Sequence, residues 1–229
     1  KVLIIKKNLS ISVGDEGGFA PMISKNEEAL DLIVAAIKKS GFKNGKDVSI
    51  CLDVAANELF KNNKYSIHSK KFESVDKSIK QYLKIIKKYN IKSLEDPFSE
   101  NDWKSWNMLM KNVKKVQIVG DDLYVTNIER LKKGVLNKSS NSILIKPNQI
   151  GTVSETLEVI EFAQLTGFKT IISHRSGDSE DTFIADLAVG TASNQIKTGS
   201  LARSERVAKY NRLLKIEEEL GNLTKMYKL

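Results

Sequence analysis

The chain has 229 residues, of which 41% are hydrophobic and 28% charged, and its formal net charge is +9. This composition is that of a soluble globular protein, and no apolar run approaches the ~20 residues that a membrane-spanning helix needs. The excess of Lys and Arg would suit a polyanion, but the lysines are spread over predicted helix surfaces without interleaved aromatic residues, so we expect no nucleic-acid partner.

The opening residues and the single cysteine limit where the chain can work. Residues 1–7 begin with a positive charge, but their apolar part has only four residues, which is shorter than the ~7–15 residues of a signal-peptide core. Because the first residue is Lys rather than Met, we expect a fragment or a processed chain. The single Cys51 excludes an internal disulfide and a Cys-based metal site, and it fits a reducing compartment. Cys51 lies in an apolar run, so we expect a buried and inert thiol.

Segments with helical periodicity follow one another along the chain. Residues Asn26–Ser40 carry apolar side chains at helical spacing, and Gly41 stops this helix. Residues 61–71 are polar and predict a turn or short hairpin, in which we expect His68 to be solvated. An apolar face predicts a second helix over Ser74–Tyr89. Thr152 and Glu155 have capping-box spacing and predict the start of a helix that ends at Gly167, with Leu157, Ile160 and Ala163 facing inward. Further helices are predicted around Trp103 and Trp106, around Ile128 and Leu131, over Asp181–Val189 and over Ser204–Leu220.

Seven apolar, strand-like runs alternate with these helices, and each ends in a charged residue. Their ends follow one another at roughly 30-residue intervals, which is typical of βαβ units. Residues 116–119 and 142–145 are apolar in succession, as expected for parallel strands buried on both faces. We therefore predict an α/β fold with a parallel sheet or barrel, whose chemistry lies at the carboxyl ends of the strands. The runs are Ser12–Glu16, Ile50–Asp53, Ser93–Asp96, Ile118–Asp122, Ile143–Lys146, Ile171–Arg175 and Asn194–Lys197.

Neighbouring parallel strands would bring the charged residues at their ends into one concave face. Three successive strands end in Asp53, Glu95 and Asp121, and hard oxygen ligands on rigid elements suit Mg²⁺. A single Asp after a strand is more often a helix cap or turn residue, but three at matching strand ends favour a metal site. The full set at this face is Glu16, Asp53, Glu95, Asp121, Lys146, His174, Arg175 and Lys197.

The basic residues of this face suggest roles of their own. Lys146 ends an apolar strand, where burial and nearby cations would lower its pKa toward that of a base; the alternative is an ion pair with one of the carboxylates. Arg175 and Ser176 offer a planar guanidinium and a hydroxyl group to a phosphate. Lys197 offers its charge to a second anionic group.

The motifs at these strand ends resemble those of the enolase (phosphopyruvate hydratase) family, most of all its bacterial type. The match runs from about Leu9 to Leu220, with departures at Cys51, where a small residue is usual, and at Asn57, where Ser is usual. It covers the C-terminal barrel part of that family. The matching motifs are Val13–Pro21 (VGDEGGFAP), Ser93–Phe98 (SLEDPF), Gly120–Asn127 (GDDLYVTN), Leu144–Gly151 (LIKPNQIG), Ser173–Gly177 (SHRSG) and Gln195–Gly199 (QIKTG).

The resemblance implies a role for each carboxylate and for one lysine of the concave face. Asp53, Glu95 and Asp121 correspond to the Mg²⁺ ligands, and Glu95 and Asp121 are also expected close to the substrate. Lys146 corresponds to the base that takes the C2 proton of 2-phosphoglycerate. Glu16 corresponds to the acid that assists the departure of hydroxide.

The remaining residues of the face are implied to hold the substrate. Arg175 and Ser176 match contacts to the phosphate, His174 matches a position near the leaving group, and Lys197 matches a contact to the carboxylate. The implied function is that of a Mg²⁺-dependent lyase of glycolysis that interconverts 2-phosphoglycerate and phosphoenolpyruvate. The resemblance also implies a homo-oligomer in the cytoplasm, and it leaves a cell-surface or secreted form open.

The same resemblance predicts what the chain lacks. We expect residues 1–229 to form one domain, an incomplete TIM-like (β/α) barrel of about seven βα units, without the family's N-terminal α+β domain and first barrel element. Seven strands do not close an eight-stranded barrel, so an unpaired edge would remain. The resemblance also implies that a closing loop and another catalytic glutamate are absent, so we expect the isolated fragment to be weakly active or inactive. The alternative is a non-catalytic remnant or binding protein that retains the barrel fold. Every matched site position is intact, which favours the enzyme.

Overall fold

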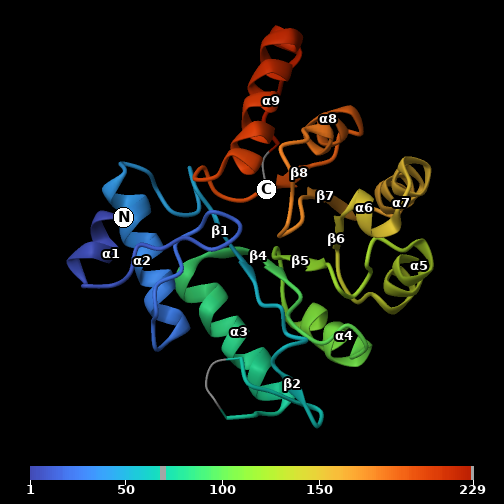
Figure 1. Cartoon of the computed structure of the whole chain (residues 1–229). Coiled ribbons are helices and arrows are strands. Elements are labelled where there is room, and N and C mark those ends of the chain that lie inside the picture. The colour runs from blue at the N-terminus through green and yellow to red at the C-terminus, as the bar shows by residue number, and fades with distance from the viewer. Residues whose placement is uncertain (68–70, 228–229) are drawn as a thin grey trace.

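The computed structural model describes residues 1–67 and 71–227, and it shows a parallel sheet curled into a half-barrel with helices on its outer side (Figure 1). His68, which we predicted to be solvated, lies outside the described residues. Six strands are hydrogen-bonded in chain order, each parallel to its neighbour. They are β1 (Ile50–Asp53), β4 (Ile91–Glu95), β5 (Gln117–Gly120), β6 (Ser142–Ile145), β7 (Lys169–Ser173) and β8 (Gln195–Lys197).

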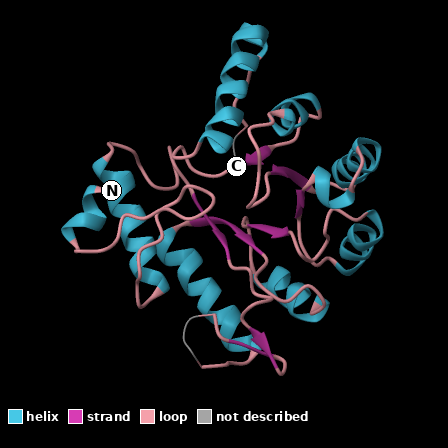
Figure 2. Ribbon diagram, viewed as in Figure 1, coloured by secondary structure: helices cyan, strands magenta, loops and turns pink. Residues whose placement is uncertain are grey.

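Helices follow most of the strands and cover the outer face of the sheet, as Figure 2 shows in cyan around the magenta strands. A two-stranded hairpin, β2 (Phe60–Lys61) and β3 (Lys64–Tyr65), confirms the predicted turn in that region. The helices are α1 (Val2–Lys6), α2 (Asn26–Lys39), α3 (Val75–Tyr89), α4 (Trp103–Asn112), α5 (Ile128–Asn137), α6 (Pro147–Ile150), α7 (Val153–Leu165), α8 (Phe183–Gly190), α9 (Ser204–Leu220) and the 3₁₀ helix Gly221–Leu223.

Local chemistry explains where several of these helices begin and end. The Thr152 hydroxyl accepts a hydrogen bond from the backbone N–H of Glu155 (3.2 Å) and donates one to its carboxylate (2.6 Å), which confirms the predicted start of α7. Asn127 caps α5 by accepting from the N–H groups of Glu129 and Arg130. Helix α3 ends where Asn90 adopts a left-handed conformation.

The core lies between the sheet and its outer helices. Leu94, Ile118, Ile143 and Ile172 point outward from the strands and are fully buried against the helices. Alternate strand residues point to the opposite face, where Val119, Leu144 and Ile171 form a smaller cluster inside the curl. Because parallel neighbours share one register, with Asp53 beside Glu95 and Glu95 beside Val119, the carboxyl ends of the strands lie along one rim.

Three expectations from the sequence are wrong. Ser12–Glu16 is not a strand, because it forms only an isolated bridge between Val13 and Phe19. Within the described residues the parallel sheet therefore has six strands rather than the seven predicted. Cys51 is exposed rather than buried, because it lies on β1, which is an edge strand of the sheet. Leu157 is 43% exposed, since the buried stripe of α7 runs through Thr156, Val159, Ile160 and Ala163.

Among the described residues, no helix is both long and apolar enough to span a bilayer.

We predict that Gly134→Ala lowers the free energy of unfolding although Ala favours a helix. An added Cβ at this position in α5 would collide with the buried ring of Tyr124. Overpacking costs ~1–3 kcal/mol, against a helix-propensity gain of ~1 kcal/mol, so we expect a net loss of about 1 kcal/mol in urea unfolding followed by circular dichroism. Gly190→Ala at the end of α8 is the matched control and should not destabilise, because an added Cβ there would meet no described atom within 4 Å beyond its chain neighbours and its own helix backbone. Equal stability of the two variants would contradict this packing.

Candidate active site

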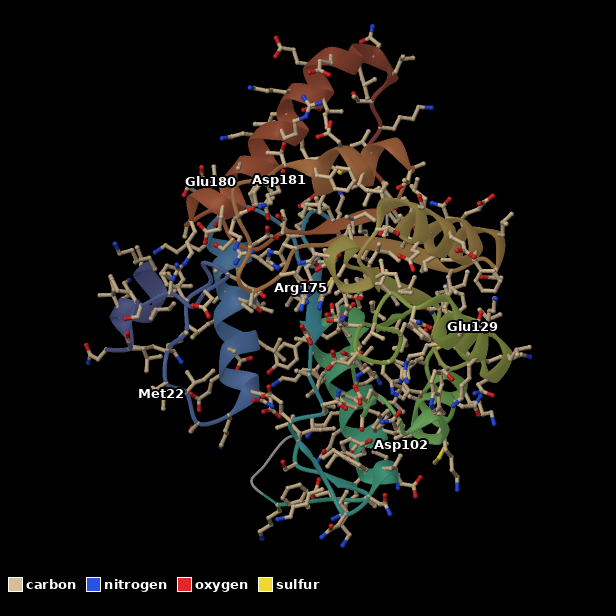
Figure 3. All side chains as sticks on the ribbon, turned by 45° about the vertical axis from the view of Figure 1, so that its right-hand side comes forward. Met22, Asp102, Glu129, Arg175, Glu180 and Asp181 are labelled. Atoms are coloured by element: carbon tan, nitrogen blue, oxygen red, sulfur yellow. The ribbon has the colours of Figure 1, made fainter. Side chains whose placement is uncertain are left out.

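The carboxyl rim of the sheet carries the residues that the sequence singled out. Asp53 and Glu95 end β1 and β4, Asp121 follows β5, Lys146 follows β6, and Lys197 ends β8. His174 and Arg175 follow β7, and Arg175 lies toward the middle of the molecule in Figure 3, away from Asp102 and Glu129 at the periphery. The structure thus brings to one rim the charges of six strands, as the parallel register requires.

Lys197 links two strand ends at the rim. Its Nζ lies 2.8 Å from Asp53 Oδ2 and 2.7 Å from Glu95 Oε1. Burial lowers the pKa of Lys197, but the Glu95 and Asp53 carboxylates outweigh this effect and hold the pKa above its ordinary value. Burial and the negative charge of Asp53 raise the pKa of Glu95 to about 7, although Lys197 opposes them. One cation therefore balances two acids here.

Lys146 forms the second ion pair of the rim. Its Nζ lies 2.5 Å from Asp121 Oδ2, and both side chains are largely buried. The ion pair that the sequence left as an alternative for Lys146 is therefore present. Burial raises the pKa of Asp121, and the nearby Lys146 opposes this shift. The other oxygen, Asp121 Oδ1, is buried without a hydrogen-bond partner, so this carboxylate has an unused acceptor.

His174 and Glu16 form a third contact at the rim. The imidazole is buried, and its Nε2 lies 3.4 Å from Glu16 Oε2. Its Nδ1 lies 2.7 Å from Nη1 of Arg206, a buried residue of α9 that the sequence did not indicate. Burial lowers the pKa of His174; the Glu16 charge opposes this shift and Arg206 adds to it.

The two residues predicted to contact phosphate follow His174 in the loop after β7. The Arg175 guanidinium is half-buried and donates to Asn148 Oδ1 at 3.3 Å, while its backbone N–H donates to Asp178 Oδ2 at 3.1 Å. Ser176 is exposed, and its carbonyl oxygen accepts a hydrogen bond from Arg206. Both side chains therefore lie at the rim, within a loop whose backbone is held by Arg206 and Asp178.

Residues 1–228 match the family described as the C-terminal TIM barrel domain of enolase. The chain belongs to the enolase family. It is 82% identical over all 229 residues to a protein named enolase from Pelagibacter ubique (strain HTCC1062), of which it covers 55%. The family resemblance seen in the strand-end motifs is confirmed, and so is an incomplete TIM-like barrel. The chain spans about half the length of this curated relative.

Asp96 is a further rim residue of this enolase barrel that sequence reasoning did not assign. Its two carboxylate oxygens accept the backbone N–H groups of Asp121 and Asp122, each at 2.9 Å. Burial raises the pKa of Asp96 to about 8, although these two N–H groups favour its charged form. Asp96 thereby clamps the turn that carries Asp121. The sequence signal was the Glu-Asp doublet at residues 95–96, but it does not tell which carboxylate faces the rim.

The rim carboxylates fit a divalent metal ion. Among the described residues, Asp121 Oδ1 is a buried acceptor without a hydrogen-bond partner. Asp53 and Glu95 already share one cation, the ammonium group of Lys197. Carboxylate oxygens of Asp96, Asp121 and Asp122 also lie within 4.8 Å of one another. Both oxygens of Asp96 already accept backbone N–H groups, so this carboxylate also holds the turn. The predicted ligand set of Asp53, Glu95 and Asp121 stays a prediction.

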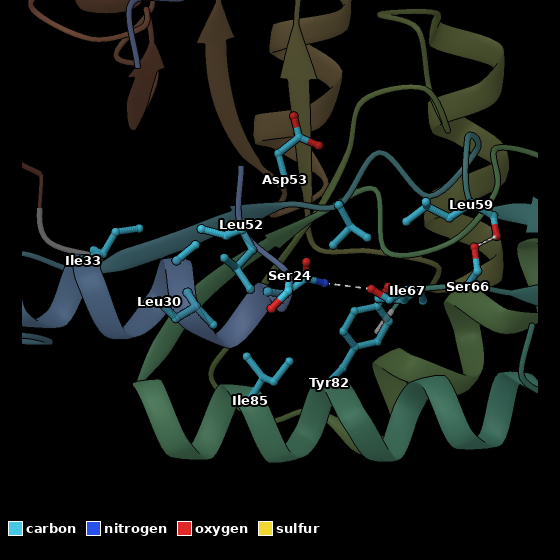
Figure 4. A pocket seen from close by; sticks show the side chains of 14 residues that line it. Ser24, Leu30, Ile33, Leu52, Asp53, Leu59, Ser66, Ile67, Tyr82 and Ile85 are labelled. Atoms are coloured by element: carbon cyan, nitrogen blue, oxygen red, sulfur yellow. Dashed lines mark hydrogen bonds between the residues drawn. The ribbon is translucent and has the colours of Figure 1, made fainter. Parts of the chain in front are cut away.

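A cavity of about 610 Å³ lies beside the edge strand β1, between α2 and α3, and it is separate from most of these charges. Its lining is mainly apolar, with Leu30, Leu52, Tyr82 and Ile85 among its residues. Asp53 is its one residue from the predicted set, and Figure 4 shows the Asp53 side chain directed away from the apolar group. An apolar cavity does not suit a phosphorylated substrate, so we place the candidate site at the rim.

We predict that Asp96→Asn destabilises the chain by about 2 kcal/mol, because the new amide NH₂ group must face one of two buried N–H donors. Hydrogen exchange measured by NMR should also show faster exchange of the Asp121 and Asp122 amides. Asp122→Asn is the control, since its amide oxygen can still accept from Asn57 Nδ2, which lies 2.8 Å from Asp122 Oδ2. Unchanged stability and exchange in Asp96→Asn would contradict the clamp.

Proposed function

We propose that the rim is the active site of a Mg²⁺-dependent lyase that interconverts 2-phosphoglycerate and phosphoenolpyruvate. The observation that carries the proposal is the grouping at one rim of three acids with two lysines, in a chain of the enolase family. Removal of a proton beside a carboxylate concentrates negative charge on that group, and a site for this reaction needs positive charge there.

Asp53, Glu95 and Asp121 would hold the metal ion. When bound, Mg²⁺ supplies positive charge that stabilises the carboxylate of the substrate as its charge increases. Lys197, the cation between Asp53 and Glu95, is positioned to meet the same substrate group. Few protein ligands suit Mg²⁺, which keeps water and substrate oxygens in its other positions.

Lys146 would take the C2 proton at its Nζ. Lys146 is paired with Asp121 in this structure, and an ammonium group cannot accept a proton. The proposal therefore requires this pair to separate, and the ammonium to lose its proton, when Asp121 becomes a metal ligand. Such a change is chemically reasonable because a carboxylate that shares its charge with a metal ion stabilises an ammonium less.

Glu16 and His174 would act on the leaving hydroxyl. Glu16 is partly exposed and lies beside the buried Nε2 of His174, so a proton carried by its carboxyl can reach an oxygen that departs from C3. Arg175 and Ser176 would contact the phosphate through charge-assisted hydrogen bonds. Family membership further supports a glycolytic role in the cytoplasm and a homo-oligomer, which belong to the same proposal.

We predict that Asp121→Asn weakens Mg²⁺ binding at least ~tenfold, which corresponds to ~1.4 kcal/mol, because a hard anionic ligand is lost from a site with few of them. Isothermal titration calorimetry on the 229-residue chain measures the effect. Asp186→Asn is the control, since that carboxylate pairs with Arg212 on α9 (2.6 Å) rather than with the rim. An affinity equal to that of the wild-type chain would remove Asp121 from the ligand set.

The base is tested in a chimera in which this chain replaces the matching part of the Pelagibacter ubique relative. Lys146→Met should slow exchange of the C2 proton of 2-phosphoglycerate with solvent deuterium ~10²–10⁴-fold, while the substrate still binds, because a general base is lost. Lys132→Met, which removes an exposed ion pair with Glu129 on α5, should leave exchange unchanged. Exchange at the control rate in Lys146→Met would assign the proton transfer to another group.

A further inference from the structure

Arg206 is a buried cation whose one ion pair among the described residues is long. Its side chain is 1% exposed, and the carboxylate nearest in the described contacts, Glu205, lies 3.9 Å from its Nε. Instead, its guanidinium donates to three backbone carbonyls, those of Asp15, Arg175 and Ser176, and contacts His174 Nδ1. A buried charge is costly unless its hydrogen bonds are satisfied, and Arg206 Nε has no hydrogen-bond partner among the described residues. This cost indicates a role beyond packing.

The contact between Arg206 and His174 determines where the imidazole carries its proton. A guanidinium group has only donors, so the nitrogen 2.7 Å from its Nη1 must be an acceptor. If His174 Nδ1 accepts, the proton of the neutral ring is on Nε2. That nitrogen is buried, has no hydrogen-bond partner, and lies 3.4 Å from Glu16 Oε2. It is a donor that lies beside the acid of the proposed reaction.

Gly199, in the loop after β8, lies close to both Glu16 and Arg206. Gly199 has a φ of +78°, and a Cβ there would lie 2.8 Å from the carbonyl oxygen of Glu16 and 2.9 Å from Arg206 Cδ. The next residue, Ser200, donates its backbone N–H to the same Glu16 carbonyl. The loop between β8 and α9 therefore packs against both Glu16 and Arg206, the two residues that contact His174.

We propose that Arg206 is a positioning residue that holds His174 as a neutral imidazole with its proton on Nε2, so that Nε2 donates a hydrogen bond to an oxygen of the Glu16 carboxyl group or to an oxygen that leaves the substrate beside it. The catalytic part of this statement rests on the proposed function. His174 then acts as a fixed donor and does not take up a proton. The proton that reaches the leaving oxygen comes from Glu16.

The charges around the ring agree with a neutral His174. Burial lowers the pKa of the imidazole, and the cationic Arg206 and Lys197 lower it further, while the carboxylates of Glu16 and Asp178 act in the opposite direction. The resulting pKa lies below that of an ordinary histidine, so the ring is neutral near pH 7.

The tautomer can be measured directly, because the sequence contains only two histidines. Long-range ¹H–¹⁵N NMR spectra of the ¹⁵N-labelled chain distinguish protonated from unprotonated ring nitrogens, and His68→Gln assigns the signals. We expect His174 to show a protonated Nε2 and an unprotonated Nδ1 at pH 7. A ring protonated on Nδ1, or on both nitrogens, would overturn the proposal without the need for any Arg206 variant.

Substitutions then test whether Arg206 is the cause. Arg206→Met should populate both tautomers and shift the titration of His174 to higher pH, whereas Arg206→Lys, which keeps a charged donor, should retain the Nε2–H form. Lys209→Met is the matched control, because Lys209 lies on the same helix, is equally buried, and donates to the Glu205 carbonyl and Asp178 rather than to His174. If the tautomer and titration of His174 stay the same in Arg206→Met, or change as much in Lys209→Met, Arg206 does not determine the tautomer.

Kinetics in the chimera separate this inference from the proposed function. Arg206→Met should lower kcat on the order of 10–100-fold, the usual effect of losing a group that orients a functional imidazole, with little change in KM. The tautomer is read without substrate, so a chimera that fails to convert 2-phosphoglycerate would count against the proposed function alone. An active chimera in which His174 carries its proton on Nδ1 would overturn the inference alone.

Discussion

The ion pairs of Lys197 connect the two edges of the curled sheet. Lys197 ends the edge strand β8, and Asp53, 144 residues earlier in the chain, ends the opposite edge strand β1. The same ammonium group contacts Glu95 on β4, so three strand ends meet at one cation. Because a partly exposed ion pair contributes little net stability, we attribute to these contacts mainly the arrangement of the rim, where one ammonium group lies between two carboxylates.

Behind these rim charges lies a set of buried ionic groups that hold the backbone. Asp96 accepts the N–H groups of the turn that carries Asp121, and Arg206 donates to the carbonyl groups of the loop that follows His174. Each makes its hydrogen bonds mostly with backbone groups rather than with a side chain of opposite charge. The strands bring the residues to the rim, and the buried side chains of Asp96 and Arg206 hold the backbone of the turns that carry Asp121 and Arg175.

Periodicity and strand-end motifs predicted most of this arrangement, because helices, parallel strands and their charged ends depend on local sequence. Ser204–Leu220 was predicted at the same bounds as α9, and Lys146, Asp121 and Lys197 were placed at the rim correctly. The predictions failed where contacts between residues far apart in the sequence determine the structure. Ser12–Glu16 has the composition of a strand but pairs with no neighbouring strand in the sheet, and no local pattern in α9 tells that Arg206 is turned inward to a histidine 32 residues away.

The account depends most on the claim that the rim is a metal-dependent active site. Formation of phosphoenolpyruvate from 2-phosphoglycerate can be followed by ultraviolet absorbance in the chimera with the Pelagibacter ubique relative, first with Mg²⁺ and then after its removal with EDTA. The account predicts conversion that stops when Mg²⁺ is removed and returns when it is restored. No conversion by a folded chimera, or conversion at an unchanged rate without divalent metal, would contradict it.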